Sequence, residues 1–131
     1  MKGKQMPARR ILVIDDADDV RNVTQLSLER MGGWTVSTAR SGQEGIEKAI
    51  AEQPEAILLD VMMPDMDGPT TFRQLQANAT TRRIPVIFLT GMGQSADQRR
   101  FAALGVTACI AKPFSPLTLA NQIAAALGWE L

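Results

Sequence analysis

The feature that most constrains this chain is an apolar run that ends in a carboxylate. The run extends from Ala56 to Leu59, and Asp60 follows it directly. A turn-rich segment with Pro64 and Gly68 comes next. An uninterrupted apolar run of this length is typical of a strand that is buried on both faces of a parallel sheet. Ligands of such sheets bind at the carboxyl ends of the strands, so Asp60 is expected at the functional edge.

Strand-like runs alternate with helical stretches along the whole chain. Ser41 and Glu44 have the spacing of a capping box, which predicts that a helix begins there. Ser115 and Pro116 are expected to be the cap and the first residue of the last helix. This alternation predicts an α/β fold, a doubly wound sheet of five parallel strands in the order 2-1-3-4-5 with helices on both faces. The strands are expected at residues 11–14, 34–39, 56–60, 85–90 and 107–111.

The bulk properties indicate one small folded domain. A length of 131 residues is enough for a single core, with residues 1–9 as a flexible N-terminal tail and 10–131 as the domain. The 14 basic side chains balance the 14 acidic ones and form no basic stripe, so we expect no nucleic-acid partner. No apolar run approaches the ~18 residues that a membrane span needs, so no membrane role is expected.

The cysteine and histidine counts narrow the chemistry further. Cys109 is the one cysteine of the sequence, so the chain has no internal disulfide, which fits a reducing compartment and predicts a cytoplasmic protein. The sequence contains no histidine, which excludes a histidine base or a histidine metal ligand from this chain.

Polar side chains stand where the predicted strands end. Asp15 and Asp16 follow the first strand, Asp60 ends the third, Thr90 ends the fourth and Lys112 follows the fifth. Parallel strands bring these positions to one edge, where three carboxylates would repel one another. A hard divalent cation, Mg²⁺ or Mn²⁺, relieves that repulsion. With a lysine and a hydroxyl to bind phosphoryl oxygens, the set predicts a phosphoryl site in which one carboxylate is the nucleophile.

These residues, in this order, resemble the receiver domains of two-component response regulators, among them the stand-alone chemotaxis regulators. The resemblance extends over residues 10–128 and implies a flavodoxin-like fold. It rests on the pair Asp15-Asp16, the segment 59–68, the run Leu89-Thr90-Gly91 and the run Lys112-Pro113-Phe114.

The resemblance implies a role for each site residue. Asp60 is expected to be the phosphoacceptor, with Lys112 as the phosphate partner and Thr90 as the switch hydroxyl. A metal ion is expected on Asp15, Asp16, Asp60 and the backbone carbonyl of Met62. The family also implies a cis peptide bond between Lys112 and Pro113, which is compatible with the energetics of such bonds.

The same resemblance implies a function in a phosphorelay. A sensor histidine kinase or a histidine phosphotransfer protein would donate the phosphoryl group to Asp60. The chain would catalyse only its own phosphorylation and dephosphorylation, so it is not expected to be a metabolic enzyme. Output is expected through a protein target that binds the face made by the fourth helix, the fifth strand and the fifth helix. The chain is expected to be a monomer or a weak dimer.

Two features depart from the family pattern. The switch position that is usually aromatic is Cys109 here, so the coupling to Thr90 is expected to differ. The positions two after Asp60 and two after Thr90 are Met62 and Met92. Thioethers cannot position an attacking water molecule, so we expect a longer-lived phosphoryl group than in relatives with polar side chains there.

Two other classes of protein stay open at this point. A haloacid-dehalogenase-like phosphatase would use Asp16 as its nucleophile, within the motif Asp16-Ala17-Asp18-Asp19-Val20. That family needs acidic metal ligands after the lysine, where Glu130 is the one acid, and it gives Asp60 no role. The other class is a phosphorylation-independent interaction module of the same fold, although the complete acidic set argues against it.

Overall fold

The computed structural model describes residues 8–91 and 95–131, without the side chains of 95–98. Most of the expected tail over residues 1–9, and Met92, lie outside the described residues. The strands form one parallel sheet in the order β2-β1-β3-β4-β5, which confirms the predicted doubly wound fold. In chain order the elements are β1 (Arg10–Ile14), α1 (Asp18–Gly32), β2 (Thr35–Ala39), α2 (Gly42–Glu52), β3 (Ala56–Asp60), α3 (Gly68–Ala77), β4 (Val86–Thr90), α4 (Ser95–Leu104), β5 (Ala108–Ala111) and α5 (Leu119–Leu127).

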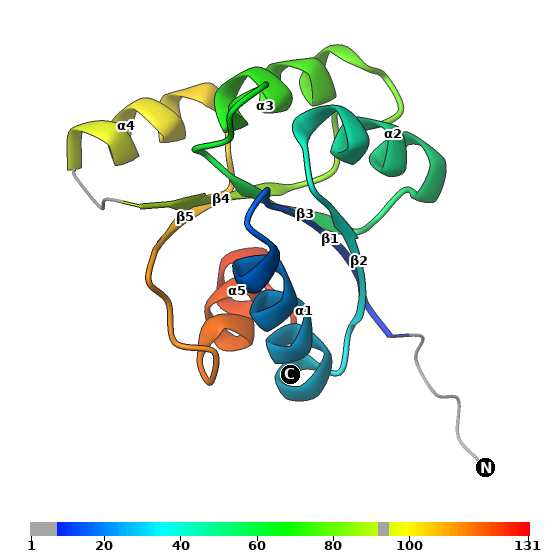
Figure 1. Ribbon diagram of the computed structural model, residues 1–131, viewed down its shortest axis with the longest axis vertical. Helices are drawn as coiled ribbons and strands as arrows, with labels where there is room; N and C mark the ends of the chain where they lie inside the picture. The colour runs from blue at the N-terminus through cyan, green and yellow to red at the C-terminus, as the bar shows by residue number, and fades with distance from the viewer. Residues whose placement is uncertain (1–7, 92–94) are drawn as a thin grey trace.

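The helices cover the sheet from both sides, as Figure 1 shows. Helices α1 and α5 pack on one face, and α2, α3 and α4 pack on the other. The side chains of each central strand alternate between two hydrophobic clusters, so that Leu58 belongs to the cluster under α1 and α5 and Leu59 to the other. Both side chains are fully buried. This burial on both faces explains why β3 is an unbroken apolar run and not an alternating one.

Two of the helices begin at a residue whose side chain caps the helix N-terminus. The Ser41 side chain accepts a hydrogen bond from the backbone N–H of Glu44 at 3.1 Å, as the capping-box spacing predicts. The Asp67 side chain accepts one from the backbone N–H of Thr70 at 2.9 Å, so this residue is the N-cap of α3. Asp67 therefore fixes the point where the chain leaves the turn after β3.

The predicted start of the last helix is wrong. Residues 116–118 form a turn, and α5 begins at Leu119. The carbonyl of Ser115 accepts hydrogen bonds from the backbone N–H groups of Thr118 and Leu119, at 3.1 and 3.0 Å. The carbonyl of Pro116 accepts a hydrogen bond from the Ser27 hydroxyl of α1. Because this tertiary contact engages the Pro116 carbonyl, the helix begins three residues later than the local signal indicates.

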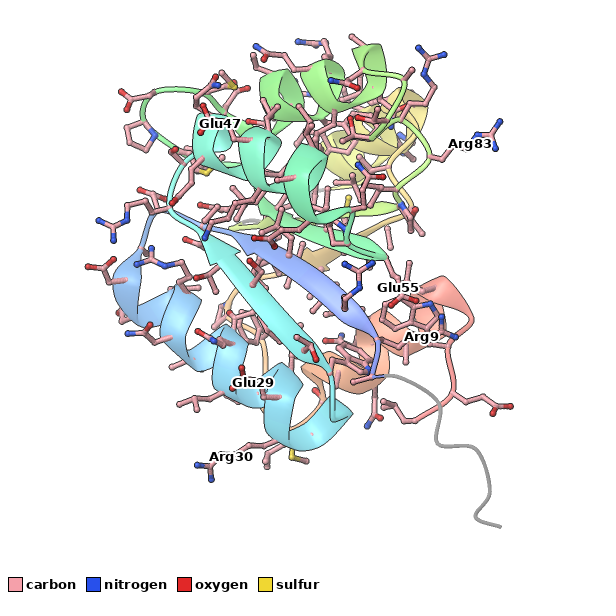
Figure 2. All side chains as sticks on the ribbon, turned by 90° about the vertical axis from the view of Figure 1, so that its right-hand side faces the viewer. Arg9, Glu29, Arg30, Glu47, Glu55 and Arg83 are labelled. Carbon is pink, nitrogen blue, oxygen red and sulfur yellow. The ribbon has the colours of Figure 1, made fainter. Side chains whose placement is uncertain are left out.

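The two termini of the domain meet at the end of the sheet opposite Asp60. Arg9 pairs with Glu55 at 3.1 Å, and Figure 2 shows both side chains beside the start of β1. The Arg9 guanidinium also lies 4.8 Å from the centre of the Trp129 ring. Trp129 meets Trp34 edge to face with the ring centres 5.1 Å apart. Both tryptophans therefore pack within the domain and join its two ends.

Candidate functional site

Three aspartates meet at the carboxyl edge of the sheet. Strands β1 and β3 are neighbours, which places Asp15 and Asp16 after β1 beside Asp60 at the end of β3. One carboxylate oxygen from each of the three lies within 4.8 Å of the other two. Asp15 is 0% and Asp60 3% exposed, while Asp16 is exposed. The cluster is therefore buried on one side and open to solvent on the side of Asp16.

Lys112 reaches this cluster from the loop after β5. Its ammonium nitrogen lies 3.1 Å from Oδ2 of Asp15 and 3.0 Å from Oδ1 of Asp60. The backbone N–H of Lys112 donates to the carbonyl of Thr90 at 2.7 Å, which continues the ladder between β4 and β5. The peptide bond between Lys112 and Pro113 is cis, as predicted. The sheet itself thus positions the ammonium between the two buried carboxylates.

The electrostatics show that one ammonium does not fully compensate two buried carboxylates. Burial raises the pKa of Asp60 above its usual value of 3.8, and repulsion from Asp15 adds to this effect, although the hydrogen bond from Lys112 opposes it. Burial alone lowers the pKa of Lys112, but its hydrogen bond to Asp60 and the charges of both carboxylates outweigh burial and raise that pKa above 10.5. A second positive charge at the cluster would therefore stabilise the ionised form of Asp60.

The donor set fits a hard divalent cation. All three groups offer carboxylate oxygens, two of them already held in place and one open to solvent. Mg²⁺ prefers oxygen ligands and usually keeps several of its water molecules, which an open side allows. The acidic cluster is thus suited to hold Mg²⁺.

Thr90 and Met62 flank Asp60. Thr90 is the last residue of β4, is 5% exposed, and follows Leu89, the partner of Asp60 in the ladder between β3 and β4. The backbone N–H of Met62 donates to Oδ1 of Asp60 at 3.4 Å, and the Met62 side chain is 75% exposed. A thioether thus stands in solvent next to Asp60, and the proposed ligand role of the Met62 carbonyl stays a prediction.

Gly68 lets the first turn of α3 approach this loop closely. A Cβ atom at Gly68 would lie 2.8 Å from Cα of Val61 and 2.9 Å from the carbonyl oxygen of Asp60. The backbone N–H of Gly68 also donates to the carbonyl of Val61 at 2.9 Å. Because any side chain here would press on the backbone of Asp60 and Val61, only glycine fits without a shift.

The sequence interpretation missed one charged residue near the aspartates. Arg21, in the first turn and a half of α1, donates from Nη1 to the backbone carbonyl of Asp15 at 2.9 Å and from Nη2 to the Asp18 carboxylate. The spacing of Asp18 and Arg21 is that of a helical ion pair, which is a readable signal. Nothing in the sequence indicates the contact with the Asp15 carbonyl.

Comparison with known proteins identifies the family. The model of the response regulator receiver domain matches residues 11–124, so the chain belongs to that family. The alkaline phosphatase synthesis transcriptional regulatory protein PhoP of Bacillus subtilis is 35% identical over 119 residues, which are 91% of this chain and 48% of PhoP. The DNA-binding dual master transcriptional regulator RpaA of Synechocystis is 35% identical over 118 residues, 90% of this chain and 48% of RpaA.

Solved structures agree with this assignment. The chemotaxis response regulator CheY4 of Vibrio cholerae superposes with a TM-score of 0.84 at 27% identity, over 91% of this chain and 98% of CheY4. The predicted family, its flavodoxin-like fold and its phosphoacceptor signalling class are thereby confirmed. A receiver domain is a signalling module and not a metabolic enzyme, so the phosphatase interpretation is not supported.

The curated relatives are longer than the region that matches this chain. The chain spans about half the length of PhoP and RpaA, which are both transcriptional regulators. The expectation of no nucleic-acid partner rests only on the balanced charge of this sequence, and it stays a prediction. Among the described residues, no helix combines the length and apolar character that crossing a bilayer requires.

Proposed function

We propose that Asp60 accepts a phosphoryl group from a phosphohistidine of a sensor histidine kinase or a histidine phosphotransfer protein. The observation that carries this proposal is the position of the Asp60 carboxylate. It is 3% exposed, lies 3.0 Å from the Lys112 ammonium, and has oxygens of Asp15 and Asp16 within 4.8 Å. A carboxylate between a fixed cation and two further acids suits nucleophilic attack on a bound, charge-compensated phosphoryl group.

In the proposed reaction a carboxylate oxygen of Asp60 forms a bond to phosphorus as the phosphorus–nitrogen bond of the donor breaks. Lys112, already beside Asp60, would pair with an oxygen of the transferred group. Thr90, at the end of the adjacent strand, would donate its hydroxyl to another phosphoryl oxygen. The backbones of both residues are held at the end of the sheet, since Thr90 pairs with Ala111 and the N–H of Lys112 donates to the carbonyl of Thr90.

Asp15, Asp16, Asp60 and the Met62 carbonyl would hold Mg²⁺, or Mn²⁺ in its place. When bound, the ion supplies positive charge to the oxygens of the transferring phosphoryl group. Asp15 would contribute from a fixed position, since its carboxylate is buried and held by Lys112 and by the N–H of Ala17 at 3.0 Å. Asp16, the exposed member of the cluster, would bind the ion from the solvent side.

A protein donor is supported by the surface beside the site. A hollow of about 480 Å³ opens next to Lys112, and its apolar wall is formed by Val20, Val23, Pro113 and Phe114. Apolar surface next to a reactive carboxylate suits a protein partner better than a small charged donor alone. The output surface of the module is proposed to be the face of α4, β5 and α5, in a cytoplasmic protein that acts as a monomer or weak dimer.

The test is phosphorylation by a small acyl phosphate with Mg²⁺, followed by intact-protein mass measurement. The wild type is expected to gain one phosphoryl group, whereas Asp60→Ala gains none. Asp65→Ala, which removes an exposed acid of the same loop, is the matched control and should be phosphorylated like the wild type. Modification that persists in Asp60→Ala but is lost in Asp16→Ala would overturn the proposal. The absence of any adduct on the wild type would favour the phosphorylation-independent module.

A further inference from the structure

We propose that Arg21 is a positioning residue for the cation site, because it holds the peptide group that joins Asp15 to Asp16. The inference rests on the proposed function, in which both aspartates bind the metal. Arg21 itself is expected to contact neither the ion nor the phosphoryl group. Its role would be to fix the direction in which the exposed Asp16 side chain leaves the backbone.

The contacts of Arg21 are specific to this turn. Its Nη1 donates to the carbonyl oxygen of Asp15 at 2.9 Å, and its Nη2 pairs with the Asp18 carboxylate. The Arg21 side chain is 11% exposed although it carries a full charge. A largely covered guanidinium that bridges a backbone carbonyl and a side-chain carboxylate restrains both with planar, directed donors. The turn between β1 and α1 is thereby tied to the helix that follows it.

The two aspartates differ in what else restrains them. The Asp15 carboxylate is held by Lys112 at 3.1 Å and by the backbone N–H of Ala17 at 3.0 Å, and its own N–H donates to Ala39 at 3.0 Å. Asp16 is exposed. Its backbone N–H belongs to the same planar peptide group as the Asp15 carbonyl. Fixing that carbonyl therefore fixes the plane from which Asp16 extends toward the other two carboxylates.

The charge of Arg21 alone predicts the opposite effect. A buried positive charge next to a cation site repels the cation, so its removal would raise metal affinity if Coulomb interaction dominated. Asp18 offsets this repulsion, since its carboxylate pairs directly with Nη2 of Arg21. Because Asp18 compensates the charge of Arg21, the hydrogen bond from Arg21 to the Asp15 carbonyl is its main effect on the site. The sign of the affinity change thus separates the two effects.

The experiment is a titration with Mn²⁺, in which the electron paramagnetic resonance signal of the free ion gives the dissociation constant. Three variants are compared with the wild type. Arg21→Gln removes the charge and the bridge, and Arg21→Lys keeps the charge but loses the two-point bridge. Arg30→Gln is the matched control, because it removes a positive charge from an exposed position at the far end of the same helix (Figure 2).

We expect both Arg21 variants to bind Mn²⁺ about 10-fold more weakly, the lower end of the effect of removing residues that orient metal ligands. Arg30→Gln should stay within about twofold of the wild type, as a screened and distant charge does. Circular dichroism before the titration restricts the comparison to folded protein, and Arg21→Lys keeps the test decisive if Arg21→Gln does not fold. Wild-type affinity in a folded Arg21 variant, or tighter binding in Arg21→Gln, would overturn the inference.

The outcome also separates this inference from the proposed function. A wild type that binds no Mn²⁺ at millimolar concentration contradicts the proposed metal site and the inference together. A wild type that binds the ion, with folded Arg21 variants that bind it equally well, contradicts the inference alone. Deuterium exchange at the Ala17 amide gives a second readout, because a looser turn exposes that N–H whereas loss of charge alone does not.

Discussion

Replacing Lys112 by methionine should leave two buried carboxylates without their counter-charge. Lys112 hydrogen-bonds to Asp15 and Asp60 at 3.1 and 3.0 Å, and both acids are almost fully buried. Methionine keeps the apolar stem that lines the hollow beside Val20 and Phe114. The substitution thus removes the ammonium while it preserves most of the packing. Any large loss of stability can then be assigned to the uncompensated acids.

The expected cost follows from the burial of the partners. Removing one member of a buried ion pair costs about 3–5 kcal/mol. The Lys112 side chain is 23% exposed, so water partly screens its interactions and the lower end, about 3 kcal/mol, applies. With a urea m-value of about 2 kcal/mol/M, the midpoint of unfolding should fall by about 1.5 M. The measurement is equilibrium unfolding in urea, in buffer from which divalent cations have been removed.

Two further measurements test the cause of this loss. Lys112→Met should cost at least about 1 kcal/mol less in an Asp60→Asn background than in the wild type, because only one buried charge is then left unpaired. Mg²⁺ should stabilise Lys112→Met more than it stabilises the wild type, because the ion replaces the lost positive charge. The reasoning is refuted if Lys112→Met unfolds within about 0.5 kcal/mol of the wild type, the range of ordinary surface substitutions. Equal costs in both backgrounds would refute it as well.

Three other substitutions probe the same edge of the sheet. Because Asp60 has a raised pKa, it contributes stability that is present below its unfolded-state pKa, near 3.8, and is lost as pH rises through its folded-state pKa. The stability of Asp60→Asn relative to the wild type should therefore increase as the pH rises through this range. Thermal unfolding at a series of pH values in the absence of metal measures this difference. Gly68→Ala should cost about 1–3 kcal/mol in urea unfolding and slow phosphorylation by acyl phosphate, because the new Cβ meets the Val61 backbone at 2.8 Å. Met62→Asn should change stability by less than about 0.5 kcal/mol, since the side chain is 75% exposed. It should still speed the loss of the phosphoryl group several-fold in a mass-resolved decay, and an unchanged rate would contradict the role given to the thioether.

The sheet edge could be predicted from the sequence because two simple regularities determine it. Apolar runs of strand length gave the strands, and parallel order brings every carboxyl end to one side. Asp15, Asp16, Asp60, Thr90 and Lys112 are single residues at those ends, so an error of one or two residues in a helix boundary does not move them. The meeting of these residues at one edge thus follows from the topology, whereas the direction of the Asp16 side chain depends on the turn after β1.

The contacts that could not be predicted depend on rotamers and on tertiary partners. Ser115 and Pro116 form a good local helix start, yet the Ser27 hydroxyl binds the Pro116 carbonyl and the helix begins later. The bond from Arg21 to the Asp15 carbonyl needs the actual path of the turn after β1. Each of these side chains reaches a backbone carbonyl whose direction no periodicity encodes.

Cys109 occupies the position that is usually aromatic in the family, and its place in the sheet relates it to Thr90. Cys109 pairs in register with Phe88, and Thr90 pairs with Ala111 two positions along the same ladder. Side chains two apart in a strand share a face, so Cys109 and Thr90 both face the layer that contains α4. A hollow of about 190 Å³ beside Cys109, with Val106 in its wall, shows that the thiol does not fill the space between α4 and β5.

The thiol is also poorly suited to act as a chemical switch, because burial raises its pKa above the usual 9.0 and keeps it protonated. A conformational change at Thr90 therefore meets a small, uncharged side chain and a partly open hollow instead of a ring that must move. Two-state behaviour requires two packed arrangements of similar free energy, and the rotamers of a small thiol differ much less in packing than two positions of an aromatic ring. If phosphorylation at Asp60 alters the face of α4, β5 and α5, we expect a shift of α4 over this hollow to carry the change.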